Sequence, residues 1–251
     1  MKNLLLKIIG FPATLIHGDS AVLDRFFWLR KNLLSGNKRV LDAGCGSGAF
    51  TIYAAKIGNE ALGVSFDERN NKIASERAKI LNIPNVKFIT GDLRELDKMS
   101  DKIGKFDQII CCETIEHILN DQKLIKDFAS LLNAGGQVLI TSPYKNYKPL
   151  HGDEKTGLST WEDGGHVRYG YTFDNMSSLM KNAGLEVKST TYITGFISQQ
   201  LINLQRRLCG FNPMFAWFII FPFRLLQLLD PLISKIIKYP HLSVGVVAIK
   251  K

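Results

Sequence analysis

Residues 40–51, VLDAGCGSGAFT, decide the fold of this chain. A short apolar run ends in an acidic residue, three glycines follow at alternate positions, and an apolar stretch of helical pattern comes next. This order predicts a strand, a tight turn and a helix N-terminus in direct succession. Glycine tolerates positive φ and has no Cβ, so a ligand can lie against bare backbone. The following helix points free N–H groups at that turn.

The glycines have Gly-x-Gly-x-Gly spacing, with Asp42 two residues ahead of the first. A dinucleotide-binding turn has Gly-x-Gly-x-x-Gly instead. The stretch resembles motif I of the class I S-adenosylmethionine (SAM) methyltransferases. The resemblance implies that Asp42 orders the turn and helps to hold the methionine end of SAM, while Gly44, Gly46 and Gly48 lie against it. A Rossmann-like turn for another nucleotide is the alternative.

Length and composition fit one domain of generous size, or one domain with an insertion. The 251 residues are 45% hydrophobic and 22% charged, enough to build a core. The four cysteines show no Cys-x-x-Cys spacing, so neither a disulfide framework nor a structural zinc site is expected. The net charge of +9 suits nucleic acid, anionic headgroups or an acidic substrate, and does not choose among them.

Strand and helix patterns alternate along most of the chain, which predicts a parallel sheet covered on both faces. The expected strands are 39–43, 61–66, 86–91, 106–112, 137–141, 186–193 and 243–249. The expected helices are 49–57, 68–81, 121–132 and 174–182. The family pattern covers about 19–194 plus the last strand, which it implies to be antiparallel beside the fifth. We therefore expect an α/β, Rossmann-like, seven-stranded, mostly parallel sheet with helices on both faces and an apolar helical insertion before the last strand.

Two helices are expected ahead of the first strand. Residues 1–16 predict a short amphipathic helix with Leu4, Leu5, Ile8 and Ile9 on one face, which would cover the core or touch a membrane. Asp19 or Ser20 can cap a second helix that runs to about residue 34. Its inward positions are expected to be Val22, Leu23, Phe26, Phe27, Leu29 and Leu33.

The ends of the second and third strands supply further candidate SAM ligands. Ser65 stands where most of the family has an acidic ribose ligand, and Gly-Val-Ser-Phe is similar to the cyclopropane fatty acid synthases. That similarity implies that Phe66 lies against adenine and Asn70 points toward the ribose, with Asp67 as a rival ligand or a helix cap. The resemblance also implies that Asp92 accepts from the adenine amino group and that Leu93 offers its backbone N–H.

The end of the fourth strand carries Glu113, Glu116 and His117, with Glu-x-x-Glu-His spacing. The candidate catalytic residues are Glu116 and His117, together with His166 of the later loop. On the first turn of a helix, Glu113, Glu116 and His117 share a face, and two carboxylates with an imidazole suit a hard divalent cation. The cluster is similar to ubiquinone-biosynthesis O-methyltransferases and to small-RNA 2′-O-methyltransferases of the Hen1 type, which add a distal histidine that His166 matches. A Mg²⁺ or other divalent metal on Glu113, Glu116, His117 and His166 is one hypothesis. A metal-free site with His117 as general base and Glu113 lining the SAM pocket is the other.

Residues 145–170 form a long polar and aromatic stretch after the fifth strand. We expect this stretch to line the acceptor pocket, although a plain surface loop is the alternative. The candidate pocket residues are Tyr144, Tyr147, His151, Trp161 and Arg168.

Residues 195–240 are strongly apolar, where the family usually has a short connection. A membrane-spanning helix needs about 20 apolar residues, whereas Pro213, Pro222, Arg224 and Asp230 interrupt this run. Basic residues beside Trp and Phe favour a helix that lies in the membrane interface. A cap buried on the core or in a dimer interface is the alternative. The chain thus divides into a SAM-binding core with N-terminal helices (1–194), the insertion (195–240) and the last strand of the core (241–251).

These features together predict a SAM-dependent methyltransferase that is cytoplasmic and peripheral on the inner face of the membrane. The expected reaction is O-methylation of a hydroxyl on a hydrophobic or lipid-linked acceptor, such as a quinone, a glycolipid or a polyprenyl-linked sugar. C-methylation or cyclopropanation of a lipid chain, RNA 2′-O-methylation, and a non-enzymatic SAM-fold scaffold are the alternatives. The sequence leaves the acceptor, the methylated atom and the oligomeric state open.

Overall fold

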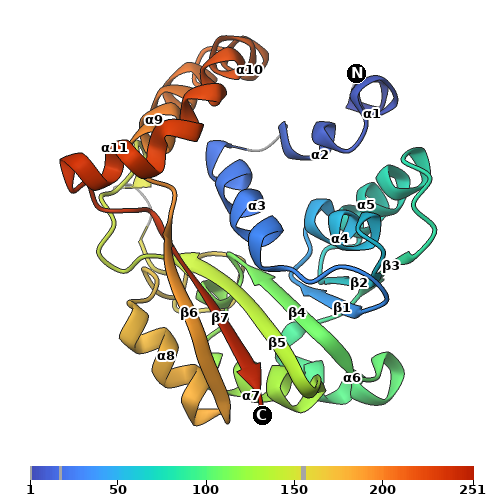
Figure 1. The fold of residues 1–251 in the computed structure, drawn as a ribbon. Helices are drawn as coiled ribbons and strands as arrows, with labels where there is room; N and C mark the ends of the chain where they lie inside the picture. The colour runs from blue at the N-terminus through green and yellow to red at the C-terminus, as the bar shows by residue number, and fades with distance from the viewer. Residues whose placement is uncertain (1, 17–18, 154–156) are drawn as a thin grey trace.

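A seven-stranded sheet of order β3-β2-β1-β4-β5-β7-β6 forms the centre of the protein (Figure 1). The computed structural model describes residues 2–16, 19–153 and 157–251. Strands β1 to β5 pair in parallel, and β7 lies antiparallel between β5 and β6. The strands are β1 (Arg39–Ala43), β2 (Glu60–Ser65), β3 (Val86–Thr90), β4 (Phe106–Cys112), β5 (Leu132–Pro143), β6 (Leu185–Ile193) and β7 (Ser243–Lys250). The predicted Rossmann-like fold is confirmed, with the last strand antiparallel beside the fifth.

Helices cover both faces of the sheet because alternate strand residues point to opposite sides. In β4, Ile109 and Cys111 belong to one buried layer, and Ile110 belongs to the other. The layer of Ile109 is closed by α6 (Leu96–Ile103), α7 (Asp121–Leu131) and α8 (Phe173–Asn182). The layer of Ile110 is closed by α3 (Ser20–Asn32) and α4 (Ala49–Lys56), and α5 (Glu68–Ile80) packs beside α4.

Side-chain caps fix where several helices begin. Asp19 accepts a hydrogen bond from the backbone of Val22 at the start of α3, and Asp67 accepts one from Arg69 at the start of α5. The caps predicted at Asp19 and Asp67 are confirmed. Helix α6 lies where the sequence analysis expected no helix, although Leu96, Met99 and Ile103 recur at helical spacing and form its inward side.

The N-terminal region differs from its prediction. Two helices form in place of one, α1 (Lys2–Ile9) and α2 (Pro12–Ile16), because Gly10 takes a φ of 68° and Pro12 begins the second helix. Leu6 is buried, whereas Leu4, Ile8 and Ile9 of the predicted apolar face are exposed. In α3, Phe26 is buried but Phe27 is exposed, so the inward position predicted for Phe27 was wrong.

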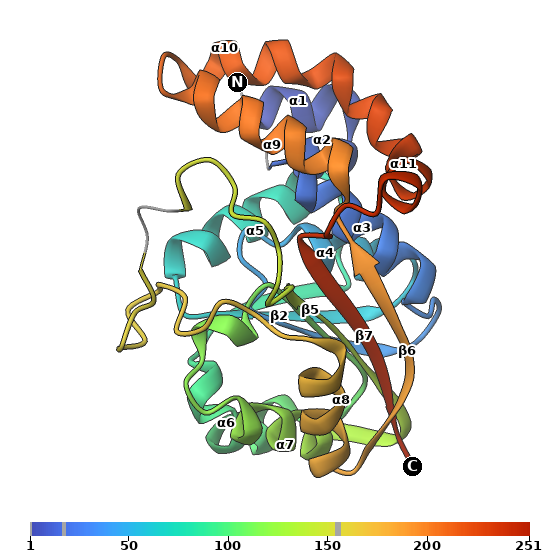
Figure 2. The same cartoon turned by 90° about the vertical axis from the view of Figure 1, so that its left-hand side faces the viewer.

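The insertion before β7 is helical, as predicted. Its elements are α9 (Phe196–Cys209), α10 (Pro213–Ile220), the 3₁₀ segment η4 (Phe221–Leu229) and α11 (Asp230–Ile237). These elements lie at the same end of the molecule as α1 and α2 in both views (Figures 1 and 2). The 25-residue stretch Pro213–Ile237 is long and apolar enough to cross a membrane, judged by length and composition alone.

Candidate active site

The turn after β1 is held from within the protein. Asp42 is buried at the end of β1 and accepts a hydrogen bond from the Thr51 hydroxyl at 2.6 Å. Burial raises the pKa of Asp42 to about 6, against the two hydrogen bonds from Thr51 that lower it. The backbone N–H groups of Gly44 and Cys45 both donate to Val64 O on β2. This arrangement fixes the turn against the neighbouring strand.

The three glycines of the turn are needed for two different physical reasons. All three have positive φ, at 87° for Gly44, 48° for Gly46 and 79° for Gly48. A Cβ at Gly44 would lie 2.3 Å from the Thr114 hydroxyl, and one at Gly48 would lie 2.6 Å from the Ala74 Cβ. No atom lies within 4 Å of a Cβ built on Gly46. Gly44 and Gly48 therefore allow close packing, and Gly46 presents backbone that a ligand can approach.

The end of β2 exposes an aromatic ring beside a fixed polar turn. Phe66 is 77% exposed, whereas Ser65 is buried and its hydroxyl accepts from the Asp67 backbone. Asp67 caps α5, and its carboxylate also pairs with Arg69, which lowers its pKa. Asn70 is partly exposed in the first turn of α5. The ring of Phe66 is thus open to a planar ligand, while Asp67 is already occupied.

Asp92 and Leu93 follow β3 at the start of a short 3₁₀ turn, η1 (Leu93–Glu95). Asp92 accepts from the Arg94 backbone and forms an ion pair with the Arg94 guanidinium, which lowers the pKa of Asp92. Leu93 is buried. Arg94 also pairs with Glu162 at 3.1 Å, so the end of β3 is tied to the loop of residues 145–170.

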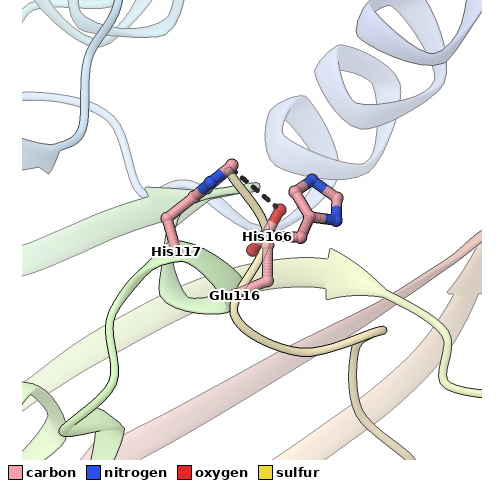
Figure 3. A group of neighbouring side chains, drawn as sticks. All are labelled: Glu116, His117 and His166. Atoms are coloured by element: carbon pink, nitrogen blue, oxygen red, sulfur yellow. Dashed lines mark ion pairs between the residues drawn. The ribbon is translucent and has the colours of Figure 1, made fainter. Parts of the chain in front are cut away.

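Glu116, His117 and His166 converge on one point, and we call these three residues the catalytic cluster (Figure 3). One side-chain donor atom from each residue lies within 4.8 Å of the others. Glu116 Oε1 is 3.9 Å from His117 Nε2, and the rings of His117 and His166 meet edge to face at 4.7 Å. His117 follows shortly after the end of β4, whereas His166 comes from the 145–170 loop, after α7 and β5 in the sequence.

Burial sets the charge states around the cluster. Glu116 is 1% exposed, and its Oε2 atom has no hydrogen-bond partner in the described part of the chain. Burial, and then the charge of Glu113, raise the pKa of Glu116 well above its usual value. Burial and the nearby His117 lower the pKa of His166, which keeps this imidazole neutral near pH 7. The site therefore favours a cation or a proton next to Glu116.

The tautomer of His117 follows from its hydrogen bond. Nδ1 of His117 lies 3.0 Å from the carbonyl oxygen of Gly165. A carbonyl only accepts, so Nδ1 carries the proton and Nε2 presents a lone pair. His117 Nε2 can therefore take a proton or bind a metal, and the residue before His166 orients it.

Glu113 does not join the catalytic cluster. The expected helical turn does not begin at Glu113, which has a φ of 48°, and only Ile115–His117 form the single 3₁₀ turn η2. Glu113 Oε1 accepts from the Thr141 hydroxyl, and Oε2 lies 3.4 Å from the Arg25 guanidinium. In the described residues, the predicted four-ligand group is thus reduced to one carboxylate and two imidazoles.

The candidate pocket residues separate into two groups. Trp161 is 76% exposed, and the side chains of Tyr144 and Tyr147 are partly exposed. Arg168 is engaged elsewhere, because its guanidinium pairs with Asp121 and donates to the Ile115 and Leu119 carbonyls. Arg168 therefore secures the loop beside η2.

The other end of the 145–170 loop is fastened to the insertion. The backbone N–H of His151 donates to Asn203 in α9 at 2.8 Å. Asp153 pairs with Arg206 of the same helix. The loop that supplies His166 is thus anchored to α9 near one end and to η2 near the other.

The sequence analysis missed two arginines that support the site. Arg25 of α3 pairs with Glu113, and its nearest charged neighbour in the sequence, Asp24, gives no sign of that contact. Arg77 of α5 is buried and donates to the Ser47 carbonyl and hydroxyl within the glycine turn. Both contacts join residues that are far apart in the sequence, so no local pattern predicts them. For Arg77, the only signal in the sequence is its helical spacing from Ala74 and Ala78, which puts it on the inward side of α5.

Comparisons with known proteins agree with this geometry. Residues 20–190 match the family model described as "Methyltransferase domain". A ubiquinone biosynthesis O-methyltransferase from Coxiella burnetii is 30% identical over 124 residues, 49% of this chain and 51% of that protein, so the match spans about half of the relative's length. The Acinetobacter baumannii protein of the same name is 28% identical over 174 residues, 66% of this chain and 72% of that protein.

Among solved structures, a putative sarcosine dimethylglycine methyltransferase from Galdieria sulphuraria superposes with a TM-score of 0.65. It is 18% identical, and the superposition covers 92% of this chain and 86% of that one. At this identity the likeness concerns the fold. With a family model over most of its length and the glycine turn in its expected place, this chain belongs to the class I SAM-dependent methyltransferases.

Proposed function

We propose that this protein transfers the methyl group of SAM to a hydroxyl on a hydrophobic or lipid-linked acceptor. A prenylated quinone, a glycolipid and a polyprenyl-linked sugar are the acceptor classes. The observation that carries the proposal is the catalytic cluster, which lies at the carboxyl edge of the parallel strands where open α/β sheets bind ligands. The relatives named ubiquinone biosynthesis O-methyltransferase support the same chemistry.

SAM would lie across the carboxyl ends of β1 to β4. Gly46 offers open backbone for the methionine end, and Asp42 holds the turn with Gly44 and Gly48 in place. Phe66 would stack on adenine, Ser65 and Asn70 would lie toward the ribose, and Asp92 with the N–H of Leu93 would bind the adenine edge. Glu113, held by Arg25 and Thr141, would line the methyl end.

The reaction needs a base at the acceptor hydroxyl. His117 Nε2 presents a lone pair, and the Gly165 carbonyl at Nδ1 would stabilise the imidazolium that forms. As the hydroxyl proton passes to His117, the acceptor oxygen attacks the methyl carbon in line, the carbon–sulfur bond breaks, and S-adenosylhomocysteine leaves. The protein contributes mainly the alignment of oxygen, carbon and sulfur.

The catalytic cluster also fits a divalent metal. The unpartnered Glu116 oxygen, the neutral His166 imidazole and His117 Nε2 form a donor set of one carboxylate and two imidazoles. Without Glu113 this set favours zinc, manganese, iron or cobalt over Mg²⁺, which prefers oxygen ligands. A bound metal would supply Lewis acidity that lowers the acceptor hydroxyl pKa.

We place the protein in the cytoplasm, peripheral to the inner face of the membrane. Two observations support this location. The apolar side chains of the insertion are exposed, and the relatives are named for the biosynthesis of ubiquinone, a hydrophobic molecule. Membrane attachment would bring the acceptor loop to lipid-borne substrates, because α9 holds that loop through Asn203 and Arg206.

Tritium-labelled SAM added to a membrane extract tests the proposal. We expect the label in the organic phase, with His117→Ala reducing incorporation by about 10²–10⁴-fold, the usual contribution of a general base. If His117→Ala incorporates as much label as the wild type, His117 is not the general base. EDTA followed by Zn²⁺, Mn²⁺ or Mg²⁺ separates a metal-dependent site from a metal-free one.

Two alternative functions are each favoured by a specific feature of the chain. The Ser65-Phe66 pattern favours C-methylation or cyclopropanation of an unsaturated lipid chain, and then the label would appear in fatty acyl chains. The charge of +9 with the catalytic cluster favours RNA 2′-O-methylation, and then ribonuclease would release the label.

A further inference from the structure

The helical segment Pro213–Ile237 buries its polar side and exposes its apolar side. Along α10, η4 and α11, buried residues recur three or four positions apart, at Ala216, Ile220, Arg224, Gln227, Asp230 and Ser234. Four of these six side chains are polar or charged. The large side chains on the other side are exposed, at Phe215, Phe218, Phe221, Leu225, Leu228, Leu232 and Ile236. We call these seven residues the outer row.

Hydrogen bonds hold the polar side to α9 of the insertion and to α3 of the methyltransferase core. Asp230 accepts from the backbone N–H groups of Gly195, Ile197 and Ser198 at the start of α9. Gln227 donates to the Ser20 carbonyl and to Asp24, both in α3. These bonds fix the rotation of the segment about its own axis, so the outer row cannot turn inward without breaking them.

Buried polar contacts continue along the segment toward the N-terminus. Arg224 and Trp217 both donate to the carbonyl of Ile16 at the end of α2, at 3.2 and 2.8 Å. Ser234 accepts from the backbone of Phe196 at 2.7 Å. The segment is therefore attached to α2, α3 and α9 by its polar side along most of its length.

The surface around the outer row is basic. Residues 196–239 contain one acidic residue, Asp230, which is buried, and residues 1–18 contain none. Among the residues whose exposure the structure describes, the exposed cations of these two regions are Lys7, Arg206, Arg207, Lys235 and Lys238, of which Arg206 pairs with Asp153. Helix α1 adds exposed Leu4 and Ile8 at the same end of the molecule (Figures 1 and 2).

We infer that the outer row and α1 form one docking surface for an anionic lipid bilayer, with the segment Pro213–Ile237 lying in the plane of the interface. This inference rests on the proposed membrane-peripheral function and names the surface and the partner. Apolar side chains enter the acyl boundary, and the flanking cations meet lipid phosphates. Burying Arg224 and Asp230 against the core keeps them away from the hydrocarbon, which removes the main cost of placing this sequence in a membrane.

A second copy of the chain fits this surface less well than a bilayer does. A two-fold dimer brings the same patch of both subunits together. Its interface would gather two sets of the cations on α9 and α11 and no exposed carboxylate from the insertion to neutralise them. Anionic headgroups supply that neutralising charge.

Vesicle flotation of the pure full-length protein tests the inference. Wild type should float with phosphatidylglycerol-containing vesicles and less with phosphatidylcholine alone. Leu225→Glu and Leu228→Glu should each lower the membrane partition coefficient by about tenfold or more. Burying one leucine side chain changes a binding constant by about that factor. The matched control is Leu34→Glu, at an exposed leucine between α3 and β1, which should float like wild type.

Several results would overturn the inference. Wild type that fails to float on any vesicle would do so, and so would Leu225→Glu and Leu228→Glu that float like wild type. A dimer in solution that these two variants convert to a monomer would assign the surface to a second copy. A protease-protected fragment of residues 213–237 would indicate a membrane-spanning helix.

Calorimetry with S-adenosylhomocysteine on the same samples keeps the proposed function separate. Wild type and both outer-row variants should bind this product equally, because the outer row lies on the insertion and the proposed SAM ligands lie at the strand ends. Loss of S-adenosylhomocysteine binding in all samples would contradict the proposed function and leave the flotation result standing.

Discussion

The sheet core and the insertion bury opposite kinds of side chain. Between β4 and its covering helices, the buried residues are apolar, such as Ile109, Ile125 and Phe128. In the insertion, Gln227 is buried against α3, and Asp230 and Ser234 are buried against α9. The leucines and phenylalanines of the outer row are exposed. The core is thus stabilised by removing apolar surface from water, and the insertion is held by directed hydrogen bonds. One chain therefore contains two regions built for two different solvents.

Matched phenylalanine truncations should separate the two regions most strongly. Phe128→Ala in the core should lower the free energy of unfolding by about 3–5 kcal/mol, because it leaves a cavity under the sheet. Phe218→Ala, at a 62% exposed position of the outer row, should change it by less than about 0.5 kcal/mol. Urea unfolding followed by circular dichroism measures both values. Similar losses would mean that the outer row is packed in solution, and the comparison would fail.

Asp230→Ala tests whether hydrogen bonds hold the insertion. Three backbone N–H groups at the start of α9 would lose their acceptor, at an expected cost of about 2–4 kcal/mol. Asp174→Ala is the control, since this exposed carboxylate lies in the first turn of α8 and has no comparable buried partners. Proteolysis within residues 195–240 should also accelerate in the Asp230 variant. Unchanged stability and proteolysis would assign the insertion's order to other contacts.

Asp42 is one of the buried polar residues of the core, and its stability effect should depend on pH. Folding raises its pKa from 3.8 to about 6, so the folded state holds the proton more tightly than the unfolded state. Stability from this group is therefore fully present below pH 3.8 and is lost as pH rises through 6. Asp42→Asn should be more stable than wild type by about 1–3 kcal/mol at pH 8, and the two proteins should be equally stable near pH 3.8.

Urea titrations of both proteins between pH 4 and pH 8 measure that difference. The same Asn variant should bind SAM more weakly, because the charge at the end of β1 is lost. A stability difference that does not change with pH would contradict the burial of an ionisable Asp42.

Gly46→Ala should have a small effect on stability and a clear effect on SAM binding. An alanine at a φ of 48° costs about 1 kcal/mol of backbone strain, and its Cβ meets no protein atom within 4 Å. Gly135→Ala, at a φ of 74° with equally open space, should cost about the same. Only Gly46→Ala should weaken SAM binding in calorimetry, by tenfold or more on our hypothesis. Equal SAM affinity in both variants would contradict the hypothesis that SAM binds at this turn.

Local patterns were sufficient for most of the core. Alternation of apolar runs predicted the strands, and Asp19 and Asp67 marked helix starts because capping depends on residues two or three positions away. The catalytic cluster was only partly predictable. Helical spacing placed Glu113 with Glu116 and His117, but the backbone at Glu113 is left-handed and its carboxylate turns to Arg25.

Contacts between distant segments explain what the sequence did not reveal. Arg25 and Glu113 are joined because α3 passes over the end of β4, and no local pattern encodes that approach. The same holds for the rotation of the insertion. Its composition predicted an apolar helix, and the helical period alone permitted either side to face the core.

The sequence by itself determined the class of the protein, because Gly-x-Gly-x-Gly spacing after an apolar run and an acidic residue is a local pattern, which can be recognised before the contacts that hold the turn are known. The tertiary structure alone decided which side of the insertion is hidden. Asp230 and Gln227 find backbone and side-chain partners in α9 and α3, and a buried polar group is stable only where such partners exist.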